Sequence, residues 1–319
     1  MPHTSPRLGP NIGFGYGLVI LGAVLFGING AVSRVAMRTG LSPETFTTLR
    51  ITGATMAFAL GALIWRRSAL RPPTGSSLLL IAGLGLVGVL ALQLTYNIAI
   101  NRLPLGIALL IEYLAPVLVV LWVRFVRGEQ VRNRMWAAIV LSVVGIATVG
   151  QVWKGLDFDT LGIVMALLAA VSFATYFLLG EHNVGFDDPL RVILWAFIFA
   201  TIVMNAIAPI WNAPDLDKDA NLLGTLDAYK LPLLLVIGWV ILLGTVTPFY
   251  LQLVALRHIP ATVVTVVATL EPLIAVVLGW AWFKESLTPV QVVGGILVLT
   301  GIALAQSARR EIVTTLPPQ

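Results

Sequence analysis

Two acidic side chains lie inside long apolar runs, where a charge is costly. Glu271 precedes Pro272 in the run ATLEPLIAV, and Glu112 lies in the run GIALLIEYLAPV. A buried carboxylate can bind a substrate ammonium group, exchange a proton, or accept hydrogen bonds that fix the packing of helices. Pro272 removes a backbone donor and disturbs the preceding helical turn, which frees carbonyl groups for a cation or water.

Glu112 has a second interpretation, because an arginine lies at a comparable depth in another apolar run. Glu112 lies about 12 Å from the end of its run at 1.5 Å per helical residue. Arg50 lies similarly deep in the second apolar run, 45–65. An ion pair between them would lower the cost of burying both charges, as an alternative to direct contact with a substrate.

Polar and aromatic side chains provide further candidates for a binding site. Gln93, Tyr96 and Asn97 follow an i, i+3, i+4 spacing, which places them on one helical face. The other candidates are Asn29, Tyr113, Tyr176, Trp239, Tyr250 and Gln252. Amides and hydroxyls bind a zwitterion without a fixed charge, and aromatic rings stack on apolar groups. The alternative roles are hydrogen bonds between helices and, for Trp and Tyr, positions at a membrane interface.

These candidates must be positioned by membrane-spanning helices. The chain is 58% hydrophobic and 11% charged, and its mean hydropathy is +0.93. Its apolar runs are each about 20 residues, the length with which a helix crosses a bilayer. The runs are 15–35, 45–65, 77–98, 104–124, 134–152, 160–180, 190–211, 232–254, 261–282 and 288–307. We therefore predict an all-α polytopic membrane protein with ten transmembrane helices.

The charges between these runs predict the orientation. If the N-terminus is cytoplasmic, the inner loops collect most arginines and the outer loops most aspartates. Both termini are therefore predicted inside, with Arg34 and Arg38 as the main exceptions. The net charge of +5 thus reflects topology and not binding to nucleic acid. The segment MPHTSPRLGPN leads into a full-length span, so we expect no removable signal peptide.

The chain also repeats itself. A shift of 156 residues places Pro104 on Pro260, Pro116 on Pro272, Glu129 on Glu285 and Gly145 on Gly301, whereas a shift of 147 places Phe26 on Phe173 and Asn29 on Tyr176. We predict two five-helix repeats, 1–152 and 153–319. Because five is odd, the second repeat is inverted in the membrane, as in many secondary transporters that bind substrate near the midplane.

The ten spans, the duplication and the stretch LEPLIAVVLGWAWFKESLTPVQVVGGILVLTGIAL (residues 270–304) resemble the EamA-type branch of the drug/metabolite transporter superfamily. The counterpart at 114–147 has the same skeleton without the Glu-Pro pair. The resemblance implies efflux of small metabolites across a bacterial inner membrane without ATP. It is strongest to amino-acid exporters, including the aromatic amino-acid exporter. Because the family shares the Glu-Pro pair across different cargoes, the resemblance favours a packing role for Glu271.

Other classes of protein fit the sequence less well. The histidines, His3, His182 and His258, lie near span ends, and no HExxH or GxSxG sequence occurs, so we expect neither an enzyme nor a metal site. No cofactor is expected, and the absence of cysteine excludes thiol chemistry. We predict export of neutral or aromatic amino acids by alternating access, as a monomer or homodimer. Export of drugs or lipid intermediates, passive facilitation and coupling to protons remain open.

Overall fold

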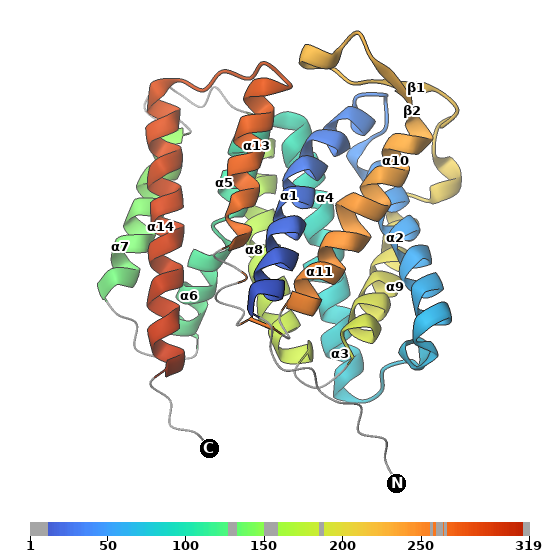
Figure 1. Cartoon of the computed structure of the whole chain (residues 1–319), viewed down its shortest axis with the longest axis horizontal. Coiled ribbons are helices and arrows are strands. Elements are labelled where there is room, and N and C mark those ends of the chain that lie inside the picture. Colours follow the sequence, from blue (N-terminus) through green and yellow to red (C-terminus); the bar gives the residue numbers. More distant parts are fainter. Residues whose placement is uncertain are drawn as a thin grey trace.

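The computed structural model describes residues 12–126, 133–149, 159–184, 188–255 and 267–314, together with residues 258, 259 and 264. These residues form a bundle of long helices with a short hairpin over one end (Figure 1). The prediction of an all-α polytopic fold is confirmed.

Five helical segments are long and apolar enough to cross a membrane. They are α1 (Ile12–Met37), α2 (Pro43–Trp65), α3–η2–α4 (Ser76–Gly83, Leu84–Ala91, Leu92–Arg102), α9 (Pro189–Ile207) and α10–η6–α11 (Leu233–Ile241, Leu242–Val246, Thr247–Ala255). The other helices are α5 (Leu105–Glu112), α6 (Ala115–Phe125), α7 (Asn133–Val149), α8 (Thr160–Val184), α13 (Leu270–Ala281) and α14 (Pro289–Thr314). The hairpin pairs β1 (Asp219–Asn221) with β2 (Lys230–Pro232), and the short 3-10 turns are η1 (Arg67–Leu70), η4 (Ile210–Asn212) and η5 (Gly224–Leu226). Each predicted span overlaps a described helix, and the number of crossings stays a prediction.

Local sequence sets where several helices begin. Ser42 caps α2 by accepting a hydrogen bond of 3.2 Å from the backbone N–H of Thr45, and Pro43 occupies the first helical position. Asp188 caps α9 in the same way, followed by Pro189. Both starts combine a polar cap with a proline whose fixed φ suits the first turn.

Two prolines at equivalent positions of the predicted repeats also lie in first turns, and both buried acids lie beside them. Helix α5 ends at Glu112, and α6 begins at Ala115 with Pro116 as its second residue. Helix α13 begins at Leu270, so Glu271 and Pro272 belong to its first turn. A proline is tolerated there because the first-turn N–H groups have no intrahelical partner. The acids therefore lie at helix ends, where backbone groups are available.

Two membrane-length segments contain π-helical turns, η2 and η6, in the third and eighth predicted spans. Gly85 and Gly88 in η2 lie against the backbones of Ala196 and Tyr176. A side chain at either glycine would collide with the neighbouring helix, so both glycines allow the helices to pack closely. Such π turns widen a helix locally and are frequent at functional sites.

Helices α7 and α14 pack along each other at one side of the bundle (Figure 1). A Cβ atom on Gly145 would lie 2.8 Å from the carbonyl oxygen of Gly294, and one on Gly301 would lie 2.8 Å from that of Ala138. Adding 156 to 145 and 138 gives 301 and 294. The two contacts are thus images of each other under the shift, as in an interface related by a two-fold axis.

The start of α1 and the end of α14 lie on one face of the bundle, and the β1–β2 hairpin lies on the opposite face (Figure 1). An even number of crossings produces this arrangement. Which face is cytoplasmic stays a prediction from the charges.

Candidate substrate-binding site

A small cavity lies at the centre of the bundle, with a volume of about 50 Å³. Its walls come from α1, α2, α4, α5, α8, α11 and α13. It is lined by Phe26, Asn29, Arg50, Leu92, Gln93, Tyr96, Leu109, Glu112, Phe173, Phe249, Gln252 and Glu271. The volume suffices for a few water molecules, so a larger ligand requires the walls to move apart.

The cavity brings together six of the predicted site residues from five separate helices. These residues are Asn29, Gln93, Tyr96, Glu112, Gln252 and Glu271. The repeat relates some of them to other lining residues, since adding 156 to Gln93 gives Phe249 and adding 156 to Tyr96 gives Gln252. Corresponding positions in the two predicted repeats therefore face one cavity.

Arg50 supplies the positive charge of the cavity and is only 3% exposed. Its Nε donates to Thr245 Oγ1 at 2.7 Å and its Nη2 to the Gly244 carbonyl at 3.3 Å, both in η6. Its Nη1 has no hydrogen-bond partner. Among the described residues, no ion pair joins Arg50 to Glu112, so a direct pair between them is a wrong expectation. The hydroxyl and carbonyl of η6 hold the guanidinium instead.

Glu271 supplies one of two buried carboxyl groups. Its Oε1 is buried without a hydrogen-bond partner. The Tyr113 hydroxyl faces the carboxyl group without forming a hydrogen bond of standard geometry, and Glu112 interacts with it electrostatically. The position in the first turn of α13 favours a carboxylate, because the N-terminal end of a helix carries partial positive charge. The contacts within the bundle therefore leave Oε1 of Glu271 without a hydrogen bond.

Gln93 and Asn29 add neutral polar groups. Neither the Oε1 nor the Nε2 of Gln93 has a partner, although the side chain is buried. The Oδ1 of Asn29 accepts a hydrogen bond of 3.3 Å from Ser33 and lies against Gly244. Any side chain at position 244 would displace Asn29, which gives this glycine a steric role beside the cavity.

Three phenylalanines form the apolar part of the wall. The rings of Phe26 and Phe249 meet edge-to-face with centroids 5.1 Å apart. Tyr176 contacts both Phe249, at 5.7 Å, and Phe173, at 6.3 Å. Tyr176 is thus a buried support behind the wall, and the cavity is not lined by it. None of these three rings was predicted as a site residue. The repeat that pairs Phe26 with Phe173 is the sequence signal that could have identified two of them.

Four other predicted residues lie outside the cavity. Asn97 is buried and donates to Thr47 Oγ1 at 2.9 Å, which ties α4 to α2. Tyr113 lies behind Glu271, and Trp239 packs half-buried against the main core. Tyr250 is 46% exposed. A spacing of three or four residues does not distinguish the cavity side of a helix from the side that packs on a neighbour, which explains Asn97.

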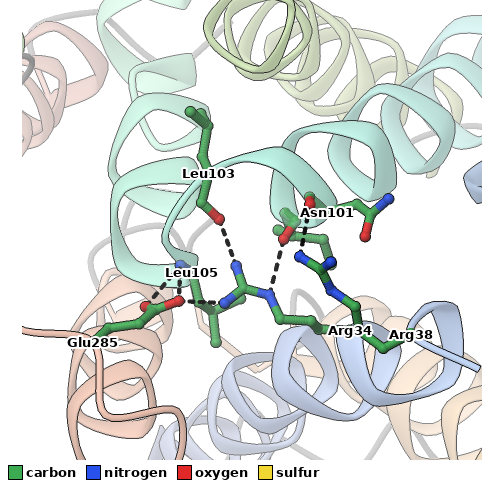
Figure 2. A network of polar contacts seen from close by, with 7 residues as sticks. Arg34, Arg38, Asn101, Leu103, Leu105 and Glu285 are labelled. Carbon is green, nitrogen blue, oxygen red and sulfur yellow. Dashed lines mark hydrogen bonds and ion pairs between the residues drawn. The ribbon is translucent and has the colours of Figure 1, made fainter. Parts of the chain in front are cut away.

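A second polar cluster lies at the end of the bundle predicted to be outside (Figure 2). Arg34 of α1 donates from Nε to the Ile100 carbonyl at 2.9 Å and from Nη2 to the Leu103 carbonyl at 2.6 Å. Its Nη1 forms a close ion pair with Glu285, and its guanidinium lies 5.1 Å from the centroid of Phe283. Arg34, an exception to the charge pattern, is therefore fully engaged in contacts within the bundle.

Glu285 joins this cluster to the first turn of α5. Its Oε2 accepts a hydrogen bond of 3.0 Å from the backbone N–H of Leu105 (Figure 2). The cap residue of α5 is Pro104, whose side chain makes no capping bond, so a carboxylate from the loop before α14 serves as the cap. We call Arg34, Glu285 and their carbonyl and amide partners the outer network. It connects α1, α5 and the α13–α14 loop, which belong to the two predicted repeats.

Comparisons with known proteins agree with this architecture. The model of the EamA-like transporter family matches residues 13–151 and 160–306. The chain is 27% identical over 312 residues to the threonine/homoserine exporter RhtA of Escherichia coli, covering 92% of each protein. It is 26% identical over 301 residues to an uncharacterized transporter of Archaeoglobus fulgidus, covering 92% of this chain and 96% of that one. A solved crystal structure shares the fold with a TM-score of 0.58 at 18% identity, covering 91% of this chain and 98% of that chain. The chain belongs to the EamA-like transporter family and is a multi-pass membrane transporter.

Proposed function

We propose that this transporter is a secondary carrier that exports neutral or aromatic amino acids across a bacterial inner membrane. The central cavity carries the argument, because it combines both signs of charge, neutral amides and an aromatic wall. A neutral amino acid has two opposite charges at one end and a side chain at the other.

Alternating access between two inverted repeats, 1–152 and 153–319, is the mechanism we propose. Three observations support it: the family model matches twice, the Gly145 and Gly301 contacts are images of each other, and equivalent positions line the cavity. Related halves of opposite orientation can exchange conformations and so open a central site to either side in turn.

The outer network supplies a barrier on the predicted outer side. It ties α1, α5 and the α13–α14 loop together at one end of the helices that carry Asn29, Glu112 and Glu271. A ligand in the cavity can leave toward that side only after these contacts break. We infer that the network forms when the site is closed to the outside and breaks when it opens.

The aromatic wall indicates the class of cargo. Phe26, Phe173 and Phe249 suit a leucine- or phenylalanine-like side chain. The relative named as a threonine/homoserine exporter supports amino acids as cargo and makes threonine a necessary comparison.

Counterflow in proteoliposomes tests the function. Vesicles loaded with unlabelled leucine, phenylalanine or threonine would receive a trace of the labelled amino acid outside. Transient accumulation of label shows a carrier, because a passive channel only equilibrates it. Glu271→Gln should reduce accumulation if the acid acts in transport, and an imposed pH gradient tests coupling to protons. Absence of counterflow with every amino acid would refute the proposal.

A further inference from the structure

We propose that Arg50 binds the carboxylate of the transported amino acid, while Glu112 and Glu271 together bind its ammonium group. The proposal rests on the function proposed above and specifies what the cavity recognises, a free carboxylate and a free ammonium group in one molecule. It also assigns to Arg50 a direct role in place of the pairing expected from sequence.

The contacts of Arg50 leave one guanidinium nitrogen, Nη1, for a ligand. Thr245 and Gly244 hold Nε and Nη2, which fixes the plane of the guanidinium. The remaining Nη1 is buried without a partner beside a cavity. A buried donor without an acceptor is unfavourable, and native structures reserve such groups for a function or a ligand. Carboxylates are the anions that match the guanidinium geometry best.

Both acids line the same cavity as Arg50. Glu271 offers the partnerless Oε1. The cavity therefore holds one guanidinium and two carboxyl groups, which are complementary to the carboxylate and the ammonium group of an amino acid. Gln93, with both amide atoms unpaired, can bond to either end of the ligand.

The same arrangement explains why the acids and Arg50 do not simply neutralise one another. Arg50 is attached to the π-helical segment η6, whereas Glu271 is attached to the first turn of α13. A zwitterion bound between Arg50 and Glu271 provides a partner for both side chains and connects η6 to α13. A ligand that lacks either charge leaves one buried group uncompensated, which is the strongest kind of selectivity a polar site provides.

Competition in the wild-type protein tests this assignment without any mutation. Counterflow of labelled leucine would be measured against unlabelled leucine, leucinol, which lacks the carboxylate, and N-acetyl-leucine, which lacks the ammonium group. We expect each analogue to compete at least about tenfold more weakly than leucine. Equal competition by leucinol would overturn the role of Arg50 while leaving amino-acid transport intact. Absence of counterflow with leucine, phenylalanine and threonine would instead overturn the proposed function and this assignment with it.

Variants then separate ligand binding from packing. In Arg50→Gln the preference for leucine over leucinol should collapse to within a few-fold, while the preference over N-acetyl-leucine persists. Arg50→Lys should keep the carboxylate preference with weaker binding, because the charge remains but the fork geometry is lost. The matched control is Asn97→Ala, which removes a buried polar group outside the cavity and should leave both preferences unchanged. An unchanged preference in a folded Arg50→Gln protein would refute the proposal.

Discussion

Glu285→Gln tests whether the outer network closes the transport path. The change keeps the size of the side chain and removes its charge, so it breaks the ion pair with Arg34 and weakens the cap on Leu105. The two charged side chains are 8% and 21% exposed, so Arg34 would stay buried without a counter-charge. The network would then hold the outward-closed conformation less tightly.

The size of the effect follows from burial. Removing one partner of a fully buried ion pair costs about 3–5 kcal/mol. Because Glu285 retains some exposure, about 2–3 kcal/mol is a reasonable expectation. At about 1.4 kcal/mol per factor of ten, the population open to the predicted outside should rise by roughly 30- to 140-fold.

Cysteine labelling measures this shift directly, because the natural chain contains no cysteine. A single cysteine at Leu109, which lines the cavity, would report access by a membrane-impermeant maleimide added outside intact cells. The labelling rate should rise in Glu285→Gln, and adding Arg34→Gln should increase it little further, since the two residues act as a unit.

A second ion pair provides the matched control. Arg102 Nη1, at the end of α4, lies 2.6 Å from Asp159 Oδ2, just before α8. The two side chains are 42% and 36% exposed. Exposed ion pairs contribute little because solvent screens them, so Asp159→Asn should change the labelling rate by only a few-fold. If the folded Glu285→Gln protein labels at the rate of the parent, the outer network is not the barrier.

Three further predictions concern packing, the site and pH. Gly145→Leu should lower the stability in detergent by about 1–3 kcal/mol or more, because a Cβ atom at position 145 would lie 2.7 Å from the backbone of α14. Gly295→Ala is the control: its Cβ atom would lie 3.4 Å from the nearest side chain, so the change should be tolerated. Gln93→Ala should weaken the apparent affinity for substrate while Asn97→Ala lowers only stability, by about 1 kcal/mol; the opposite pattern would remove Gln93 from the site. A hydrogen bond from Gly162 and the nearby guanidinium hold the pKa of Asp159 below its ordinary value of 3.8, so its stabilising contribution is present at neutral pH and lost as pH falls through the depressed pKa. Asp159→Asn should therefore remove part of the loss of melting temperature in acid, and an unchanged acid profile would contradict this.

The positions of both buried acids illustrate how far local sequence reaches. The end of α5 at Glu112 was not predicted, whereas Pro272 in ATLEPLIAV predicts a disturbed helical turn, and α13 does begin beside it, at Leu270. This succeeds because proline acts on its own helical turn, whatever packs around it. The charge pattern likewise marked Arg34 as exceptional, but it contained no indication that Glu285, far along the chain, would pair with it.

The sequence by itself determined the all-α membrane fold, the disturbed helical turn at Pro272 and the chemical groups available to a site. Each depends on hydropathy or on backbone hydrogen bonds within one segment, which the membrane requires every span to satisfy internally. Only the tertiary structure decided that Arg50 docks on η6, that Gln93 faces the cavity and that Asn97 faces α2. Lipid is as apolar as a protein core, so no hydrophobic stripe marks which side of a membrane helix faces its neighbours. That choice arises from the close fit of small residues and polar pairs across helices, which are distant in sequence and meet only in the folded bundle.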